Sequence, residues 1–353
     1  MEHGNFKSIY AWSSVVASLF YCYFIPARIP KGFLRLVSLL PVFCHFTVLP
    51  MYMPSIFFRG VSTLFITWLA NSKLLLFAFG QGPLAWAQSQ SLHIFIASAA
   101  LPIRAKRADD SNPSSSKKKV PFLNLGTEIL ALSVLLALAA KYRETAHPLV
   151  LQADYCCVIF LLVDVLVAFS SSVVRAMVGL ELEPPSNAPY ASTSLQDFWG
   201  KRWNLTVTNT LRLSVYKPVR SVSAGVVGNR WAALPAFFAT FLVSGLMHEL
   251  IYYYVSRAKP SWEVTWFFIL HGICVMIELV IKRGLKGKRE MPWFISGPLT
   301  MGFVIITSFW LFFPPLMKSG ADEMVLEEFR SLCESWKGRL GTLSPNILSP
   351  NLS

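Results

Sequence analysis

The chain has 353 residues, of which 54% are hydrophobic and only 14% are charged, and its formal net charge is +13. Soluble domains carry about 25% charged residues, so this composition excludes an ordinary water-soluble protein. The positive charge alone would admit a nucleic-acid-binding protein, but no recognition motif accompanies it, and we expect no nucleic-acid partner.

Eight stretches are long and apolar enough to cross a bilayer, which takes roughly 20 residues as a helix. In chain order they cover residues 8–26, 33–54, 56–79, 125–140, 149–179, 233–256, 262–281 and 293–317. The apolar stretch 91–103 is too short to cross, so it is expected to lie in the interface or to re-enter. The pattern predicts an all-α, polytopic integral membrane protein with about eight transmembrane helices.

The connections between these stretches differ in kind. Residues 104–120 include a Ser- and Lys-rich run that predicts a flexible surface loop. Residues 180–232 contain several aromatic side chains, which a merely solvated linker would not need. No internal repeat or inverted pair of halves is visible, so residues 1–353 are expected to form a single transmembrane domain.

Basic residues gather in alternate connections, around residues 28–35, 104–119, 201–230 and 282–289. Cytosolic loops of membrane proteins are enriched in Lys and Arg, so these connections are expected to be cytosolic and both termini lumenal. Acidic lipid headgroups or the phosphates of coenzyme A are the anionic partners that such loops would suit.

The sixth stretch contains His248 and Glu249 near its middle. Ionisable residues at membrane depth usually face a cavity and serve function. A zinc-protease motif would need a histidine at position 252, which is Tyr252, and no other metal site is expected. Ser244 precedes His248 by one helical turn, so a serine–histidine dyad is geometrically possible, although Ser244-Gly245 also suits close helix packing.

A lone His248 could instead act as a general base, because an imidazole with an ordinary pKa of about 6.5 takes up protons near neutrality. From the residues alone, a structural histidine is equally compatible. Lys73 also lies within a predicted span, where we expect it to pair with Asp164 or Glu278. The role of His271 stays open, and the tyrosines at 252–254 are expected to form an aromatic belt.

Two blocks of sequence point to a known family. Residues 197–204 read DFWGKRWN, and residues 244–249 read SGLMHE. Together they resemble the plant wax-synthase family of the membrane-bound O-acyltransferases, as do residues 68–77 and 260–265. The resemblance covers about 8–317, with its motif region at about 180–317. Lys201 and Ser72 depart from the family pattern, which has arginine and phenylalanine there.

The resemblance implies an acyltransferase with a substrate tunnel in which His248 and Asn204 are catalytic. Acyl-CoA would be a co-substrate, no cofactor would be needed, and the acceptor would be a fatty alcohol, a sterol or diacylglycerol. Residues expected to contact substrate are Asp197, Trp199, Arg202, Trp203, Ser244 and Glu249. For Trp199 and Trp203, anchoring at the membrane interface is an equal alternative.

Long-chain fatty alcohol, giving wax ester in the endoplasmic reticulum, is the first expectation for the acceptor. A lipid transporter without catalysis is the alternative of another class, and it would favour internal duplication, which the sequence does not show. The sequence makes no prediction of oligomeric state.

Overall fold

A computed structural model of the chain describes residues 2–102, 125–178, 186–284 and 291–343, and these ranges are helical without strands. Eight helical segments within them are long and apolar enough to cross a membrane. They are Ser8–Arg28, Phe33–Tyr52, Ile56–Ala78, Leu125–Tyr142, Pro148–Ala176, Ala233–Ser256, Glu263–Gly284 and Trp293–Lys318. The all-α prediction and the eight spans are confirmed, whereas the predicted loop at 104–120 lies outside the described residues.

Six spans begin and end close to single helices, and two are interrupted. The single helices are α1 (Glu2–Phe24), α2 (Phe33–Val48), α7 (Leu125–Tyr142), α8 (Pro148–Val178), α12 (Ala233–Ser256) and α13 (Glu263–Gly284). The third span joins α3 (Ile56–Ser62) and α4 (Asn71–Ala78) through a π-helical segment at Thr63–Ala70. The last span joins α14 (Trp293–Thr307) and α15 (Phe313–Lys318) through a second one at Ser308–Phe312.

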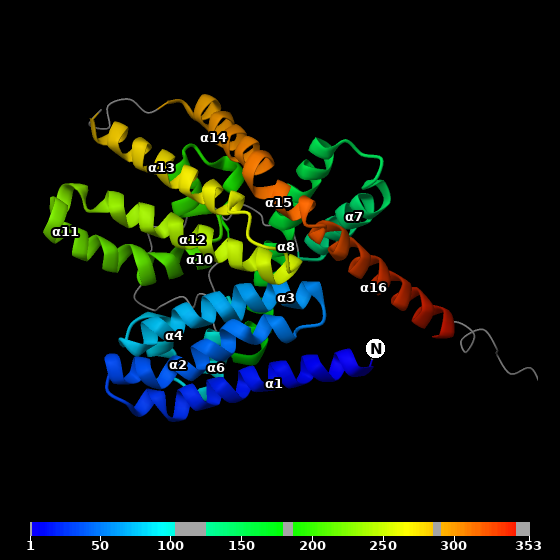
Figure 1. Cartoon of the computed structure of the whole chain (residues 1–353), viewed down its shortest axis with the longest axis horizontal. Coiled ribbons are helices and arrows are strands. Elements are labelled where there is room, and N and C mark those ends of the chain that lie inside the picture. The colour runs from blue at the N-terminus through cyan, green and yellow to red at the C-terminus, as the bar shows by residue number, and fades with distance from the viewer. Residues whose placement is uncertain (1, 103–124, 179–185, 285–290, 344–353) are drawn as a thin grey trace, which may run out of the picture.

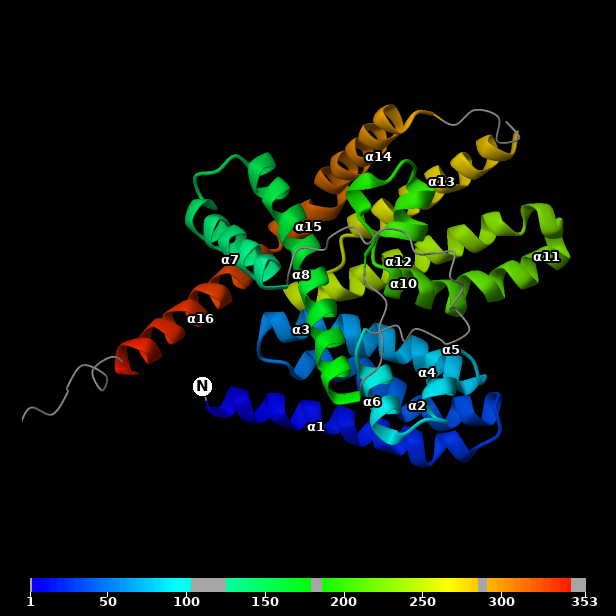
Figure 2. The ribbon, with the colours of Figure 1, turned by 180° about the vertical axis from the view of Figure 1, so that it is seen from behind.

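The amino-terminal helices α1, α2 and α4 form one bundle with two short helices, α5 (Gly82–Ala87) and α6 (Leu92–Ala100) (Figure 1). Fully buried side chains such as Leu39, Phe46, Phe77 and Phe95 fill the core of this bundle. With nine residues, α6 is too short to cross, as predicted. Figure 2 shows α8 running across the near side of the bundle beside α6, which it contacts.

Lys73 is 2% exposed in this bundle, and its partners are not the predicted carboxylates. Its ammonium group donates to the carbonyl oxygens of Ser98 (2.8 Å) and Leu101 (2.7 Å) at the end of α6. The predicted ion pair is wrong, because the last carbonyls of a helix lack partners within the helix and carry its negative dipole end. The carboxylate of Asp164 instead accepts a hydrogen bond from the hydroxyl of Ser186. Glu278 forms an ion pair with Lys282.

Helices α12 and α13 form an antiparallel pair at the centre of the second half of the chain (Figure 1). A Cβ atom added to Gly272 would lie 2.8 Å from Cβ of Phe241, and one added to Gly245 would lie 3.1 Å from Cα of Thr265. Both contacts are too close for any side chain larger than glycine to enter without movement. The packing role considered for Ser244-Gly245 is therefore confirmed for the glycine.

The connection after α8 is folded into the protein rather than lying free. It contains the single turn α9 (Leu195–Asp197), a π-helical segment at Phe198–Arg202, α10 (Leu205–Leu211) and α11 (Lys217–Trp231). A further π-helical segment at Arg212–Tyr216 joins α10 to α11. The stretch from 212 to 231 packs along α12, while α9 packs against α13. This packing accounts for aromatic residues such as Trp199 and Tyr216, which contact Phe241 and Phe237 on α12, whereas Tyr190 and Trp231 are exposed.

The helix α16 (Ala321–Leu343) is not among the candidate membrane spans, but its first turns are bonded to several of them. Glu328 accepts hydrogen bonds from the hydroxyl of Ser55 and from the backbone N–H of Ile56 (2.9 Å) at the amino end of α3. Asp322 accepts from Arg143 (3.0 Å) and from the hydroxyl of Tyr155 (3.0 Å). The rest of α16 extends away from the bundle (Figure 1).

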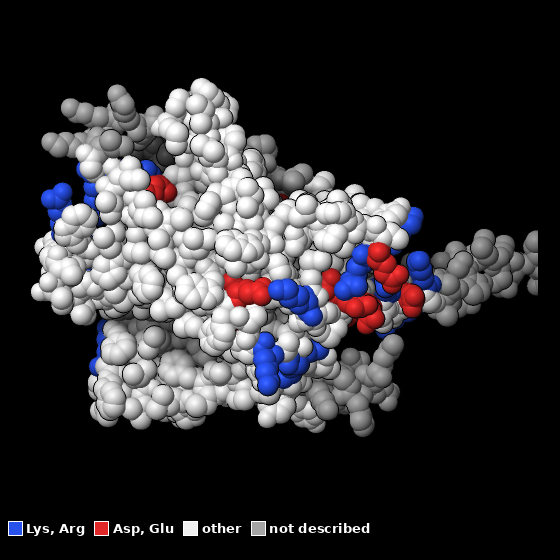
Figure 3. All heavy atoms as spheres, turned by 45° about the horizontal axis from the view of Figure 1, so that its top comes forward, with Lys and Arg blue, Asp and Glu red and all other residues white. Residues whose placement is uncertain are grey.

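The charges around this attachment are mixed in sign. Figure 3 shows acidic and basic side chains together where α16 begins, whereas Lys and Arg prevail at the opposite end of the visible face. Arg143 contacts both Asp322 and Glu323. The hydrogen bond that Arg143 donates to Asp322 raises the pKa of Arg143 above its ordinary value, so this guanidinium stays charged.

We predict that Glu328→Ala lowers the stability of the protein by about 1–3 kcal/mol, because the amino end of α3 loses its acceptor. The loss should appear as a lower unfolding temperature of the purified protein in detergent. Glu327→Ala is the matched control, since Glu327 is exposed on the same helix. Equal unfolding temperatures for the two variants would contradict the attachment.

Candidate active site

His248 is half-buried, and aromatic rings from three different spans pack around it. Its ring centroid is 4.3 Å from that of Phe268 on α13. The rings of Trp68, in the Thr63–Ala70 segment, and Phe312, in the Ser308–Phe312 segment, are each 6.0 Å away. The imidazole is half-buried, and these three rings cover part of its surface.

One hydrogen bond fixes the proton on this ring. Nδ1 of His248 lies 2.8 Å from the backbone carbonyl oxygen of Ser244, one turn earlier on α12. A carbonyl oxygen can only accept, so Nδ1 must carry the proton and Nε2 must carry the lone pair. The contact uses the backbone of Ser244, not its hydroxyl. Among the described residues, no hydrogen bond joins the Ser244 hydroxyl to the His248 ring, as a serine–histidine dyad would require.

Glu249, which follows His248, holds the turn between α12 and α13. Its buried carboxylate accepts hydrogen bonds from the backbone N–H of Trp262 (2.9 Å) and from the hydroxyl of Thr265 (3.1 Å). Trp262 has a φ of 65°, a strained conformation for a residue other than glycine, and the bond to Glu249 stabilises it. The polar role of Glu249 is thus structural support for the helix pair that carries His248.

Asn204 stands at the amino end of α10 in the left-handed region, with a φ of 35°. Its side-chain oxygen accepts a hydrogen bond from the backbone N–H of Val207 (3.2 Å), which caps the helix. Within the described ranges no hydrogen bond joins Asn204 to His248. The neighbouring Trp203 stacks on Phe198, with ring centroids 5.7 Å apart.

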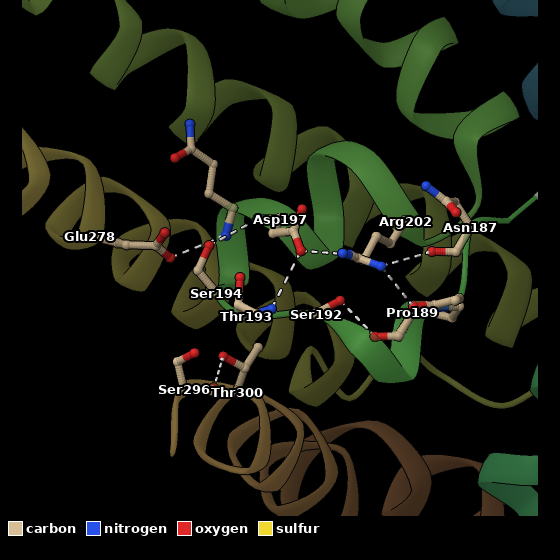
Figure 4. Close-up of polar contacts among 12 residues, drawn as sticks. Asn187, Pro189, Ser192, Thr193, Ser194, Asp197, Arg202, Glu278, Ser296 and Thr300 are labelled. Carbon is tan, nitrogen blue, oxygen red and sulfur yellow. Dashed lines mark hydrogen bonds and ion pairs between the residues drawn. The ribbon is translucent and has the colours of Figure 1, made fainter. Parts of the chain in front are cut away.

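Asp197 and Arg202 are paired with each other. Nε of Arg202 lies 2.6 Å from the carboxylate of Asp197, and the guanidinium also donates to the carbonyl oxygens of Asn187 (3.4 Å) and Ala188 (3.3 Å), as Figure 4 shows. The same view shows Glu278 on α13, which accepts from the backbone N–H of Gln196 (3.1 Å). These contacts fold the segment 187–202 and fasten it to α13.

Trp199 points into the protein and not toward the membrane interface. Its indole N–H donates to Nδ1 of His271 (3.0 Å), which is fully buried on α13. Nε2 of His271 lies 2.8 Å from the hydroxyl of Thr307. Sequence reasoning left His271 open, and its position in mid-span was the only signal.

The predicted aromatic belt at 252–254 is wrong for two of its three tyrosines. Tyr252 donates its hydroxyl to the carbonyl oxygen of Phe312 (2.8 Å), and the buried Tyr254 donates to that of Thr47 (2.5 Å). The acceptors are backbone carbonyl oxygens where a neighbouring span is interrupted or where its helix ends. Sequence spacing does not reveal such acceptors.

A hollow of about 390 Å³ lies between α7 and α8, and its wall does not include His248. It is lined by Leu138, Ala139, Tyr142, Thr145, Ala146, Val150, Leu151 and Asp154. In the part of the chain that the structure describes, no three His, Cys, Asp or Glu side chains are grouped so as to hold a metal ion.

Comparison with known proteins gives this geometry a chemical setting. Residues 182–270, which include both His248 and Asn204, match the membrane-bound O-acyltransferase family. A long-chain-alcohol O-fatty-acyltransferase of Simmondsia chinensis is 42% identical over 324 residues, which are 90% of this chain and 92% of that relative. The chain belongs to the membrane-bound O-acyltransferase family. An acyl-CoA–sterol O-acyltransferase of Arabidopsis thaliana is 40% identical to this chain. The match covers 92% of this chain and 94% of that relative.

Membership establishes the reaction class. This acyltransferase is a polytopic membrane enzyme that esterifies an alcohol with an acyl group from acyl-CoA. The expected family resemblance is confirmed. The match from 182 to 270 ends just before His271, so it contains the segment 187–202, the capped turn at Asn204, α12 and the first part of α13.

Proposed function

We propose that the enzyme makes wax esters from long-chain fatty alcohol and acyl-CoA, with His248 as the general base. The observation that carries the assignment of the base is the bond from Nδ1 to the Ser244 carbonyl, which leaves Nε2 as the proton acceptor. The aromatic surroundings of the ring support a site from which water is excluded, and this would protect the thioester from hydrolysis.

The proposed step is a direct transfer without a covalent enzyme intermediate. Nε2 of His248 takes the proton of the alcohol hydroxyl as its oxygen attacks the thioester carbonyl carbon. The carbon–sulfur bond of the resulting tetrahedral intermediate then breaks. The coenzyme A thiolate leaves and receives the proton from the imidazolium, which returns the base to its starting form. No bound cofactor or metal takes part in this scheme.

In the same proposal, Asn204 stabilises the charge that develops on the thioester oxygen. Its side-chain oxygen is engaged by the amide of Val207, so the two N–H donors of the side chain are directed away from the helix that it caps. Fixed donors of this kind commonly contribute a large part of the rate acceleration in acyl transfer. The backbone conformation at Asn204, unusual for a non-glycine residue, is consistent with a functional constraint.

We further propose that acyl-CoA enters from the cytosol, in the endoplasmic reticulum, with both termini of the chain in the lumen. The basic connections around 28–35, 201–230 and 282–289 support this orientation. They would also attract the phosphates of coenzyme A and acidic lipid headgroups. The acceptor alcohol would reach the site from the bilayer.

The base assignment predicts that His248→Ala lowers ester formation by about 10²–10⁴-fold, the usual contribution of a positioned proton acceptor. Ser244→Ala is the matched control, because it removes the hydroxyl and keeps the carbonyl that orients the ring. Activity of both variants, normalised to folded protein, decides the matter. Full activity of His248→Ala would contradict the assignment of His248 as the base. Loss of activity in Ser244→Ala without loss of folded protein would favour a serine–histidine dyad.

The role of Asn204 can be separated from its role as a helix cap. Aspartate caps helices as well as asparagine and tolerates left-handed backbone, but it has no N–H donor. We therefore expect Asn204→Asp to keep its unfolding temperature and to lose ester formation by about 10²-fold or more. Normal activity in this variant would show that Asn204 serves only as a cap.

The acceptor is tested by feeding. We expect cells that lack neutral-lipid synthesis and express this chain to make wax ester when given a long-chain fatty alcohol. Sterol and diacylglycerol are the parallel feeds, since relatives of similar identity are named for long-chain alcohol and for sterol. A sterol ester or an acetylated diacylglycerol as the main product would replace the proposed acceptor, while the reaction class would stand.

A further inference from the structure

We infer that His271 is a positioning residue for acyl transfer, which holds Trp199 and, through it, the turn that carries Asn204. The inference concerns the established transfer reaction and does not depend on His248 being the base. It rests on a chain of hydrogen bonds that starts on α13 and ends at the amino end of α10, and on the aromatic rings packed around it.

The donors and acceptors of this chain have only one consistent arrangement. An indole N–H can only donate, so Nδ1 of His271, 3.0 Å from it, must be unprotonated. The proton of the neutral ring is therefore on Nε2, which donates to the hydroxyl of Thr307 (2.8 Å). That hydroxyl in turn donates to the carbonyl oxygen of Phe303 (2.7 Å). Every polar atom of the network has a partner.

His271 and His248 consequently have opposite properties. Both nitrogens of His271 are occupied, so its ring has no lone pair to offer to a substrate proton. His248 has one nitrogen occupied and one available. We therefore assign His271 to holding the site, and we do not count it as a catalytic residue.

What His271 holds is the wall next to the base. The indole of Trp199 packs against the rings of Phe241 (5.9 Å between centroids) and Phe268 (5.6 Å). Phe268 is the ring that lies 4.3 Å from His248. A shift of the indole would be passed to Phe268 and from there to the imidazole, because such interiors are closely packed.

The same tryptophan also holds the Asn204 turn through its backbone. The hydroxyl of Thr208 donates to the carbonyl oxygen of Trp199 (2.9 Å), and the backbone N–H of Thr208 donates to the carbonyl oxygen of Asn204 (3.0 Å). The first turn of α10 is thus bonded to Trp199 at one side, while His271 fixes Trp199 at the other. The network connects the two proposed catalytic residues, which share no hydrogen bond in the described residues.

The test uses the purified full-length enzyme in lipid nanodiscs, with kcat and KM measured for acyl-CoA and alcohol. Leucine at 271 removes the acceptor for the indole, whereas asparagine can place a carbonyl oxygen near the position of Nδ1. We expect His271→Leu to lose about 10–100-fold in kcat with little change in either KM, as misplacement of catalytic groups by about 1 Å would cause. We expect His271→Asn to recover most of that loss.

Two further variants make the result decisive. Trp199→Phe removes the indole N–H donor and keeps an aromatic ring. The double variant with His271→Leu should have a kcat no lower than that of the worse single variant, because both substitutions break the same hydrogen bond. His45→Leu is the matched control, since His45 also lies in a span and contacts a hydroxyl, that of Ser14. It should keep kcat.

The inference would be overturned by equal kcat values for the leucine and asparagine variants, or by losses that multiply in the double variant. Should His271→Leu fail to fold, Trp199→Phe alone carries the test: a normal kcat in that variant overturns the inference, and a lowered kcat with unchanged KM supports it. The result is separable from the base assignment, which the His248 and Ser244 variants address.

Discussion

A single hydrogen bond, from the ring of His248 to the carbonyl of Ser244, decides what this site can do. The bond is local to α12, so the helix itself sets the state of the imidazole and needs no second residue to do so. In water the two neutral forms of the ring would interconvert freely. In this protein the bond to Ser244 selects the form with the proton on Nδ1, and aromatic rings pack around the half-buried imidazole. The rest of the fold keeps those rings in place.

Three of the four π-helical segments supply aromatic rings to this region. Trp68 and Phe312, which flank His248, come from Thr63–Ala70 and Ser308–Phe312, and Trp199 comes from Phe198–Arg202. A π-turn inserts one extra residue into a helix, so it changes the direction of the side chains that follow and costs hydrogen-bond quality. Such turns are often found at functional sites. Two of these segments bring rings to His248, and the third brings Trp199 to His271 and to Phe268, so they mark this region independently of sequence motifs.

The spans could be predicted because hydrocarbon demands about 20 apolar residues and backbone bonds made within each helix. His248 could be singled out because a polar group at that depth is costly. The partners of buried polar groups could not be predicted in the same way. Lys73, Tyr252 and Tyr254 all bond to backbone carbonyls of other helices, and every residue type carries that acceptor. The contact of Trp199 with His271 joins residues 72 apart, which no local pattern encodes.

The attachment of α16 places the boundary of the folded unit beyond the last apolar stretch. Hydropathy would end the membrane domain at Lys318, yet Asp322 and Glu328 are bonded to the fifth and third spans, and Arg330 donates to the carbonyl of Ala140 on the fourth. Residues 319–330 lie outside the candidate spans, yet they contribute to the packing of the helices within the membrane. Sequence variation in this stretch should accordingly follow that of the helix ends it contacts.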